Sequence, residues 1–169
     1  MLVSCLCDSG ANTVFHYHYA SKQLTKDYYE DCIGSIVKRK GKSGVRSTRR
    51  TRQVLNSKQF VAIAEKGFGY IEEAAPGSST ENPAKIQYFI NPVPDMLPST
   101  RMMNDAACDS KGRLIAGVKT RRGDPFNEDQ KPGTFWRLEK VAEEWKTEQI
   151  DQDMTVPNGI ALNKAGDVL

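Results

Sequence analysis

The chain has 169 residues, with 24 Lys and Arg against 21 Asp and Glu, so its net charge is only +3. This length allows one domain with a real core, and no apolar run approaches the length of a membrane-spanning helix, so we expect no membrane partner. The charge is unevenly divided: residues 1–56 carry 10 basic and 4 acidic side chains (+6), and residues 57–169 carry 14 and 17 (−3). The two parts therefore have net charges of opposite sign.

Residues 1–56 show no convincing hydrophobic periodicity, and we predict an unassigned, basic extension that is either disordered or non-native. Eight basic side chains and no acidic one lie between Lys38 and Arg52. Such a run can bind nucleic acid, but no aromatic residues are interleaved to stack on bases. The sequence therefore favours a solvated arm, and nucleic-acid binding is not expected.

Two close pairs in this part invite a metal interpretation: Cys5-x-Cys7 and His16-x-His18, with Cys32 as a further thiolate. Zinc ligands usually come as two well-spaced pairs around a compact turn, and alternate residues of a strand give the same tight spacing. We favour strand alternation. The four cysteines form no evident disulfide framework, which indicates a reducing compartment and predicts a cytoplasmic protein.

From residue 59 the pattern becomes that of short β-strands rich in aromatic and β-branched residues and separated by turns. A polar loop over residues 74–83 and a proline-rich connection over 91–100 interrupt them. The predicted strands are residues 59–64, 68–71, 85–90, 114–118 and 133–138, and residues 141–150 fit either a strand or a short helix.

One stretch occurs twice without a gap: residues 104–114 align with residues 158–168, an offset of 54. Each copy reads as strand, tight turn and strand, because Asp109-x-x-Gly112 in the first copy, like its counterpart in the second, suits a turn capped by an Asx side chain. A period of this length built from short strands is typical of a β-propeller. Two unrelated hairpins with a common turn remain the alternative.

Four segments, in the same order, resemble the regucalcin/gluconolactonase family, also called senescence-marker-protein-like lactonases. They are Lys66-Gly67-Phe68, Asn104-Asp105 with Asp109–Arg113 and Ala116-Gly117, Gly133–Leu138, and Val156–Ala161. The resemblance covers residues 59–169, and none is visible in residues 1–56.

The resemblance implies a six-bladed β-propeller with one divalent cation (Ca, Zn, Mg or Mn) in the central channel, in proteins that hydrolyse sugar lactones or related esters. Asn158 matches a metal ligand of the family, and Asn104 matches a residue that contacts substrate. The family's substrate-binding Arg is replaced here by Met102. Arg101 lies one residue earlier and can serve only if a β-bulge restores its direction.

Two further family residues find no match: an early Glu ligand, and a late Asp that is both a ligand and the proposed general base. The catalytic residue is therefore unknown. At 54 residues per unit, residues 57–169 hold about two blades. We expect an all-β, incomplete propeller: a fragment of a metal-dependent lactonase-type hydrolase, inactive as given, or alternatively a non-catalytic calcium-binding or scaffold propeller piece. The expected partner of the parent enzyme is a small lactone or ester, and open sheet edges would allow self-association.

Overall fold

The computed structural model describes residues 3–8, 11–38, 59–72, 75–93, 101–120, 133–154 and 156–163, and for residues 3–8 and 59 it describes the backbone alone. The described residues form strands and turns and contain no helix. The strands are β1 (Val3–Asp8), β2 (Thr13–His18), β3 (Gln23–Tyr28), β4 (Ile33–Lys38), β5 (Gln59–Ala64), β6 (Gly67–Glu72), β7 (Gln87–Ile90), β8 (Arg101–Cys108), β9 (Leu114–Thr120), β10 (Gly133–Val141) and β11 (Glu144–Met154).

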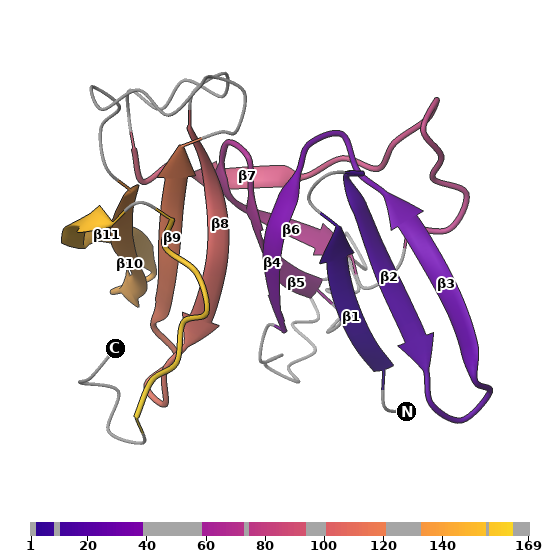
Figure 1. Ribbon diagram of the computed structural model, residues 1–169, viewed down its shortest axis with the longest axis horizontal. Helices are drawn as coiled ribbons and strands as arrows, with labels where there is room; N and C mark the ends of the chain where they lie inside the picture. Colours follow the sequence, from indigo (N-terminus) through magenta and orange to yellow (C-terminus); the bar gives the residue numbers. More distant parts are fainter. Residues whose placement is uncertain are drawn as a thin grey trace, which may run out of the picture.

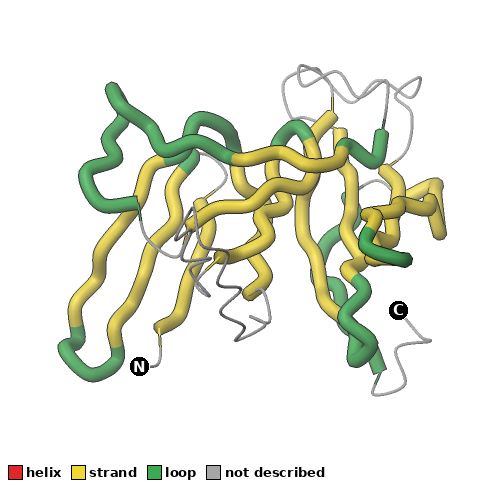
Figure 2. Tube along the Cα trace, turned by 180° about the vertical axis from the view of Figure 1, so that it is seen from behind, coloured by secondary structure: helices red, strands yellow, loops and turns green. Residues whose placement is uncertain are grey.

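The strands make three antiparallel sheets, each a meander in chain order. Sheet 1 is β1-β2-β3, sheet 2 is β4-β5-β6-β7, and sheet 3 is β8-β9-β10-β11. Figure 1 shows them side by side with sheet 2 in the middle, and Figure 2 shows the same order from behind. The first strands of sheets 2 and 3, β4 and β8, lie against each other. This radial stacking confirms the predicted all-β, partial propeller.

The prediction of disorder over residues 1–56 is wrong for residues 3–8 and 11–38, which form four strands. The boundary predicted at residues 56 and 57 cuts through sheet 2, because β4 pairs with β5. These strands are stabilised by burial: Val14 of β2 and Ile33 of β4 are fully buried in a cluster shared with sheet 2. Most of the basic run, residues 39–52, lies outside the described residues.

Sheet 2 is buried on both faces, which explains the continuous apolar run over residues 60–64. Alternate residues of a strand point to opposite faces. Val61 and Ile63 of β5 pack in the cluster shared with sheet 3, whereas Ala62 and Ala64 pack in the cluster shared with sheet 1. A strand covered on both sides needs apolar residues at every position.

At the outer strands, sheets 2 and 3 are joined by three aromatic side chains. The ring of Phe89 stacks on Tyr70 with centroids 4.5 Å apart and lies 5.2 Å from the ring of Trp145. Trp145 Nε1 of β11 also donates a hydrogen bond of 3.0 Å to the hydroxyl of Tyr70 of β6. Aromatic pairs of this geometry add roughly 0.5–1.5 kcal/mol to what their burial alone contributes. The packing between these sheets therefore extends from their inner to their outer strands.

The Asx turn predicted after β8 is confirmed. Asp109 Oδ1 accepts hydrogen bonds from the amides of Lys111 (2.9 Å) and Arg113 (2.8 Å), and Gly112 has a φ of 82°. Burial acts to raise the pKa of Asp109, but the hydrogen bonds from the Arg113 amide and side chain and the Lys111 amide outweigh it and lower that pKa. In the second copy, residues 158–163 form no strand, and the residues of its turn after Asn163 lie outside the described residues.

The ambiguous stretch over residues 141–150 is strand, not helix: β11 runs from Glu144 to Met154 and pairs with β10. It is the outermost strand of sheet 3, and most of its side chains are exposed. An exposed edge strand needs no hydrophobic alternation, so its sequence carries little signal. No helix in the described residues is long and apolar enough to cross a membrane.

Replacing Ile63 by Ala tests the packing between sheets 2 and 3. Ile63 is fully buried, so the truncation leaves a cavity and should lower the free energy of unfolding by about 2–5 kcal/mol. Urea denaturation followed by circular dichroism measures the change. Gln87→Ala, at an exposed position of β7, is the control and should change the free energy by less than about 0.5 kcal/mol. Equal losses in both variants would contradict this packing.

Because the pKa of Asp109 is lowered, its ion pair with Arg113 should stabilise the fold only above a certain pH. The carboxylate should stabilise the fold above its unfolded pKa, near 3.8, and that stabilisation should be lost as the pH falls through the lower folded pKa. At neutral pH, Asp109→Asn should therefore reduce the free energy of unfolding by about 1.5–3 kcal/mol. Urea titrations of both proteins from pH 7 to pH 2.5 should show the difference shrinking at the acid end. A difference independent of pH would show that the charge contributes nothing.

Candidate functional site

The site begins at an irregularity in β8, the inner strand of sheet 3. Met103 pairs with Val118 of β9, but Ala106 pairs with Ala116, so Asn104 and Asp105 together face the single residue Gly117. This two-against-one arrangement is a β-bulge, a feature that redirects side chains. The bulge therefore releases the Asn104-Asp105 pair from the regular ladder at the inner edge of the sheet.

Asn104 contacts the segment in which its repeat partner lies. Its Nδ2 donates a hydrogen bond of 2.7 Å to the carbonyl oxygen of Pro157 and lies 3.5 Å from Oδ1 of Asn158. The two asparagines, 54 residues apart in the chain, thus meet side chain to side chain. The family resemblance makes Asn158 a metal ligand and Asn104 a substrate contact, and the structure brings these two side chains together beside β8.

Asp105 fixes the backbone that carries Asn158. Its Oδ2 accepts hydrogen bonds from the amides of Gly159 (2.9 Å) and Ile160 (3.2 Å), and its Oδ1 accepts one from Ala106 (2.8 Å). Gly159 has a φ of 66°, a left-handed conformation that suits glycine. Sequence reasoning did not single out Asp105. Its partners are backbone amides, and a contact with a backbone amide does not require a particular residue type at the other position. The Asn-Asp motif was therefore the only feature of the sequence that could have indicated a role for Asp105.

Glycines allow the inner strands to approach closely. A Cβ atom on Gly34 of β4 would collide with the backbone of Asn104, and one on Gly117 of β9 would collide with Pro157. Residue 34, residue 104 and the segment at residue 157 therefore lie in succession along the inner edge of the molecule. This succession is what a propeller axis requires of the first strand in each blade.

Arg101, the other predicted substrate contact, opens β8 opposite Thr120. The β-bulge that its role required is present, but it lies at Asn104 and Asp105, after Arg101. Residues 101–103 pair regularly with β9, so by alternation Arg101 shares the face of Met103, which packs in the core between sheets 2 and 3. The bulge does not redirect Arg101, and its role in substrate binding stays a prediction.

The described residues do not by themselves form a site for a divalent cation. Among them, no group of three or more His, Cys, Asp or Glu side chains is placed to hold a metal ion. Asn158 can offer one neutral amide oxygen, and the Asp105 oxygens already accept three backbone amides. A calcium ion takes six to eight oxygen ligands, several of them charged. Asn158 is therefore at most one ligand of a site that other residues must complete.

The Cys and His pairs of the amino-terminal part lie on strands, as strand alternation predicts. Cys5 and Cys7 are in β1, and His16 and His18 are in β2. His16 Nε2 contacts Asp27 Oδ2 at 2.9 Å in a buried pair, and His18 Nε2 lies 3.4 Å from the hydroxyl of Thr25. Asp27 Oδ2 also accepts the amide of Ala75. The two histidines thus have separate partners within sheet 1 and its neighbouring loop.

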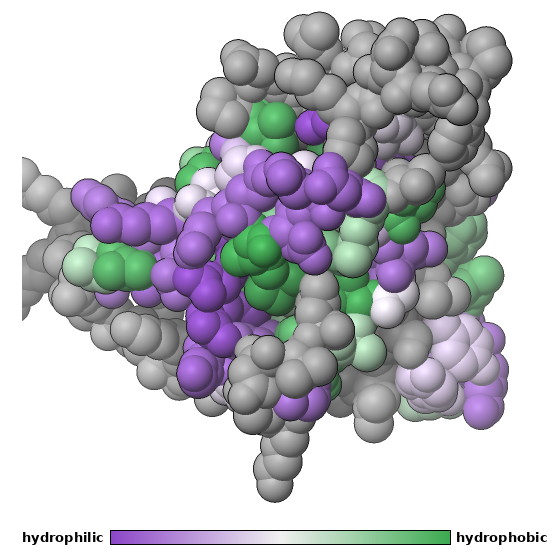
Figure 3. All heavy atoms as spheres, turned by 60° about the vertical axis from the view of Figure 1, so that its left-hand side comes forward, coloured by the Kyte–Doolittle hydropathy of each residue, from purple (hydrophilic) through white to green (hydrophobic). Residues whose placement is uncertain are grey.

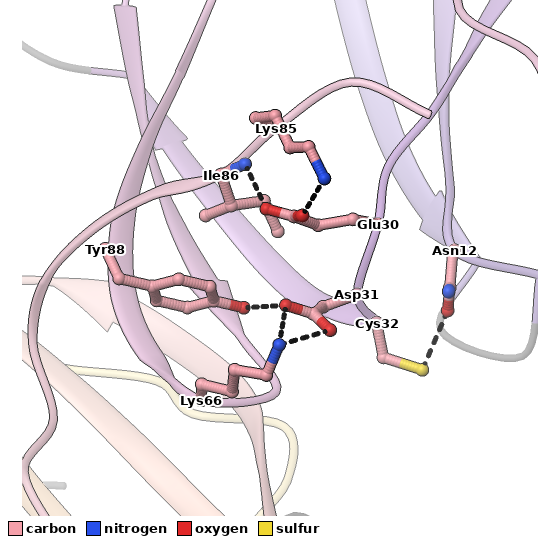
Figure 4. Close-up of polar contacts among 8 residues, drawn as sticks. All are labelled: Asn12, Glu30, Asp31, Cys32, Lys66, Lys85, Ile86 and Tyr88. Carbon is pink, nitrogen blue, oxygen red and sulfur yellow. Dashed lines mark hydrogen bonds and ion pairs between the residues drawn. The ribbon is translucent and has the colours of Figure 1, made fainter. Parts of the chain in front are cut away.

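A second polar cluster stabilises the loop that connects sheet 1 to sheet 2 (Figure 4). Lys66 Nζ reaches both carboxylate oxygens of Asp31 at 2.9 Å, and the hydroxyl of Tyr88 donates to Asp31 at 3.0 Å. The bond to Asp31 raises the pKa of Lys66, and burial, with the Asp31 charge, raises the pKa of Tyr88. Phe68, two residues after this lysine, is fully buried. Each residue of the Lys-Gly-Phe motif thus has a structural role. Lys66 pairs with Asp31, Gly67 adopts the positive φ that the turn requires, and Phe68 fills the core.

Next to Asp31, Glu30 binds Lys85 and Ile86, the two residues that precede β7. Its Oε1 accepts the amide of Ile86 at 3.0 Å, and its Oε2 pairs with Lys85 Nζ at 2.7 Å. The hydrogen bond from Lys85 lowers the pKa of Glu30. The predicted strand over residues 85–90 accordingly begins two residues later, at Gln87, because residues 85 and 86 are bound to this carboxylate instead of to β6.

Meandering sheets stacked radially, with asparagines of successive repeats meeting at the inner strands, define the propeller class of all-β proteins. The family model of the SMP-30/Gluconolactonase/LRE-like region matches residues 6–169. The chain belongs to this family. The match includes most of residues 1–56, where the sequence showed us no resemblance, and it agrees with the strands found there.

Two solved structures share the fold. A luciferin-regenerating enzyme superposes with a TM-score of 0.62 at 17% identity, covering 94% of this chain and 44% of its own. Regucalcin from Agrobacterium tumefaciens, described as a calcium-binding protein, superposes with a TM-score of 0.58 at 15% identity, covering 98% and 48%. The present chain thus spans about half the length of each. A comparison with curated protein sequences gives no match.

Removing the carboxylate of Asp105 should loosen the segment that carries Asn158. In Asp105→Ala the amides of Gly159 and Ile160 lose their acceptor, so their hydrogen exchange should accelerate by at least roughly tenfold, corresponding to about 1.4 kcal/mol of lost protection. Amide exchange followed by NMR measures this. Asp151→Ala, which removes an exposed carboxylate of β11, is the control and should leave both amides unchanged. Unaltered exchange in Asp105→Ala would contradict the positioning role.

Proposed function

We propose that this chain is part of a metal-dependent hydrolase of the lactonase type, acting on sugar lactones or related esters. The observation that carries the proposal is the meeting of Asn104 and Asn158 at the inner strands. Family membership supports the reaction class, and the calcium-binding relative supports a divalent cation, for which Ca, Zn, Mg and Mn remain candidates. In a hydrolase of this class, the cation polarises the carbonyl that water attacks.

The residues of this chain would bind and orient the substrate and the cation. The amide nitrogen of Asn104 can donate to a substrate hydroxyl or carbonyl once its bond to Pro157 is exchanged, and the amide oxygen of Asn158 can face a hard cation. Asp105 holds the Asn158 backbone in place. Arg101 is the cationic residue nearest in sequence to the Asn-Asp pair and remains a candidate for substrate binding. The thiols of Cys32 and Cys108, which form no disulfide in the described part of the chain, agree with the cytoplasmic location that we propose.

We expect the 169-residue chain on its own to be inactive. Lactone hydrolysis by this route needs a general base, and Asp105, which follows Asn104 in the chain and binds the backbone next to Asn158, already accepts three backbone amides. Among the residues that the structure describes, the cation also lacks ligands, since Asn158 supplies one neutral oxygen.

A second function is favoured by one observation: the amide nitrogen of Asn104 already donates to the carbonyl oxygen of Pro157 and lies 3.5 Å from Oδ1 of Asn158. This arrangement suits a non-catalytic calcium-binding or scaffold propeller piece, which would bind a cation or a partner without turnover. Calorimetric titration with calcium, run beside the activity assay, separates the two functions.

The activity prediction is tested with a sugar lactone in the presence of Ca, Zn, Mg or Mn, against the spontaneous hydrolysis blank. The purified chain should match the blank for every cation. Turnover above the blank that disappears in Asn158→Ala, and persists in the matched control Asn82→Ala on an exposed loop, would contradict inactivity and support the site. Turnover that survives Asn158→Ala would overturn the assignment of Asn158.

A further inference from the structure

The segment that meets β8 contains a chemically labile dipeptide. Asn158 is followed by Gly159, and no other asparagine of the chain precedes a glycine. Asparagine is thermolabile because the backbone nitrogen of the next residue can attack its side-chain carbonyl carbon. A glycine in the next position favours this attack, since it has no Cβ to shield the nitrogen and restricts the backbone least. The dipeptide with the highest intrinsic reactivity in the chain therefore lies where Asn158 meets Asn104.

The structure leaves this dipeptide open to water. Both Asn158 and Gly159 are exposed, and a Cβ atom placed on Gly159 would meet no other atom within 4 Å. In Figure 1 the described part of this segment, in yellow, runs at the left of the molecule. Figure 3 turns that side forward and shows hydrophilic side chains around a central apolar group. Solvent can therefore supply both the base and the water molecule that the reaction needs.

The nitrogen that would attack is held by Asp105. The Gly159 amide donates its hydrogen to Asp105 Oδ2 at 2.9 Å, and the Ile160 amide donates to the same oxygen at 3.2 Å. The nitrogen must lose this hydrogen as a proton before it can attack. The carboxylate opposes that loss, because it stabilises the N–H group by a charge-assisted hydrogen bond and repels a second negative charge beside it. The two bonds also restrict the rotation that would bring the nitrogen against Cγ of Asn158.

Asn104 restrains the group that would be attacked. Its Nδ2 lies 3.5 Å from Oδ1 of Asn158, and the same nitrogen donates to the carbonyl oxygen of Pro157 at 2.7 Å. The side chain of Asn158 and the backbone on either side of it are thus held by the two residues of the β8 bulge. Both reacting groups must leave these contacts before the nitrogen and Cγ can meet.

We propose that Asn158 is a modification site that Asp105 protects: the asparagine persists while the carboxylate binds the Gly159 amide, and it deamidates when that contact opens. The Gly159 nitrogen then loses its proton to a base from solvent and forms a bond to Cγ of Asn158. The bond from Cγ to Nδ2 breaks, and Nδ2 takes a proton from solvent and leaves as ammonia. The cyclic imide takes up one water molecule and opens at either carbonyl, which gives aspartate or isoaspartate. Nothing is oxidised or reduced, and water is the only co-reactant.

Either product would change the meeting point of the two asparagines. Both add a negative charge one residue before the amide that Asp105 binds, and isoaspartate also lengthens the backbone by a methylene group. The added charge is repelled by the Asp105 carboxylate, which weakens the bonds to Gly159 and Ile160. Asp105 thus preserves the chemical identity of Asn158 as well as its position. This protection does not depend on any hydrolase activity.

Peptide mapping by mass spectrometry measures the protection. The purified 169-residue chain is incubated at neutral pH, folded in buffer and unfolded in guanidinium chloride. Aspartate and isoaspartate at position 158 should form at least roughly tenfold more slowly in the folded chain, the factor that corresponds to one charge-assisted hydrogen bond. Asn82 is the internal control: it is followed by Pro83, which has no amide hydrogen, so its side chain should stay an amide in both states.

Asp105→Ala tests the role of the carboxylate directly. In the folded variant, verified by circular dichroism, the products at position 158 should form at least roughly tenfold faster than in the folded wild-type chain. Asp151→Ala, which removes an exposed carboxylate of β11, should leave the rate unchanged. Equal rates in the folded and unfolded wild-type chain would overturn the proposal, whether or not Asp105→Ala folds. So would a folded Asp105→Ala that reacts no faster than wild type, or a folded wild-type chain that reacts faster than the unfolded one, since Asp105 would then promote the attack.

Discussion

The structure depends on the burial of sheet 2 on both faces. Every residue of β5 from Val61 to Ala64 is in contact with one neighbouring sheet or the other. A sheet of this kind cannot be stable alone, because each face would expose apolar surface to water. Sheets 1 and 3 are thus held in a row by the sheet between them, and the row directs β4, β8 and the segment at Asn158 toward one axis.

The inner edge of the row is organised by backbone contacts more than by charged groups. Gly34 and Gly117 let neighbouring segments approach to a distance that no side chain would permit. Asn104 and Asp105 then join sheet 3 to the next segment through the carbonyl of Pro157 and the amides of Gly159 and Ile160. The result is a pre-formed edge whose amide side chains face each other, which suits binding and orientation. The chemistry itself needs groups that the described residues do not place there.

The sequence predicted the parts of the fold in which local pattern and burial agree. The hairpin of β5 and β6 was evident because both strands are apolar and the turn has a glycine at residue 67, whose φ is 136°. The amino-terminal strands were missed because buried polar groups such as His16 and Asp27 interrupt their pattern, and because the basic run dominated the charge of residues 1–56. The meeting of Asn104 and Asn158 followed from the repeat, whereas Asp105 acts on backbone amides and gave no pattern to read.

The aromatic contact between β7 and β11 gives the molecule an internal optical reporter. The chain has two tryptophans, and both Trp136 and Trp145 pack at the junction of sheets 2 and 3. Tryptophan fluorescence therefore reports the separation of these two sheets. The junction of sheets 1 and 2 contains Tyr29 and Tyr88 in place of tryptophan, so its opening should not change the tryptophan emission. A comparison of tryptophan emission with far-ultraviolet dichroism can thus distinguish the opening of one end of the row from the loss of the whole fold.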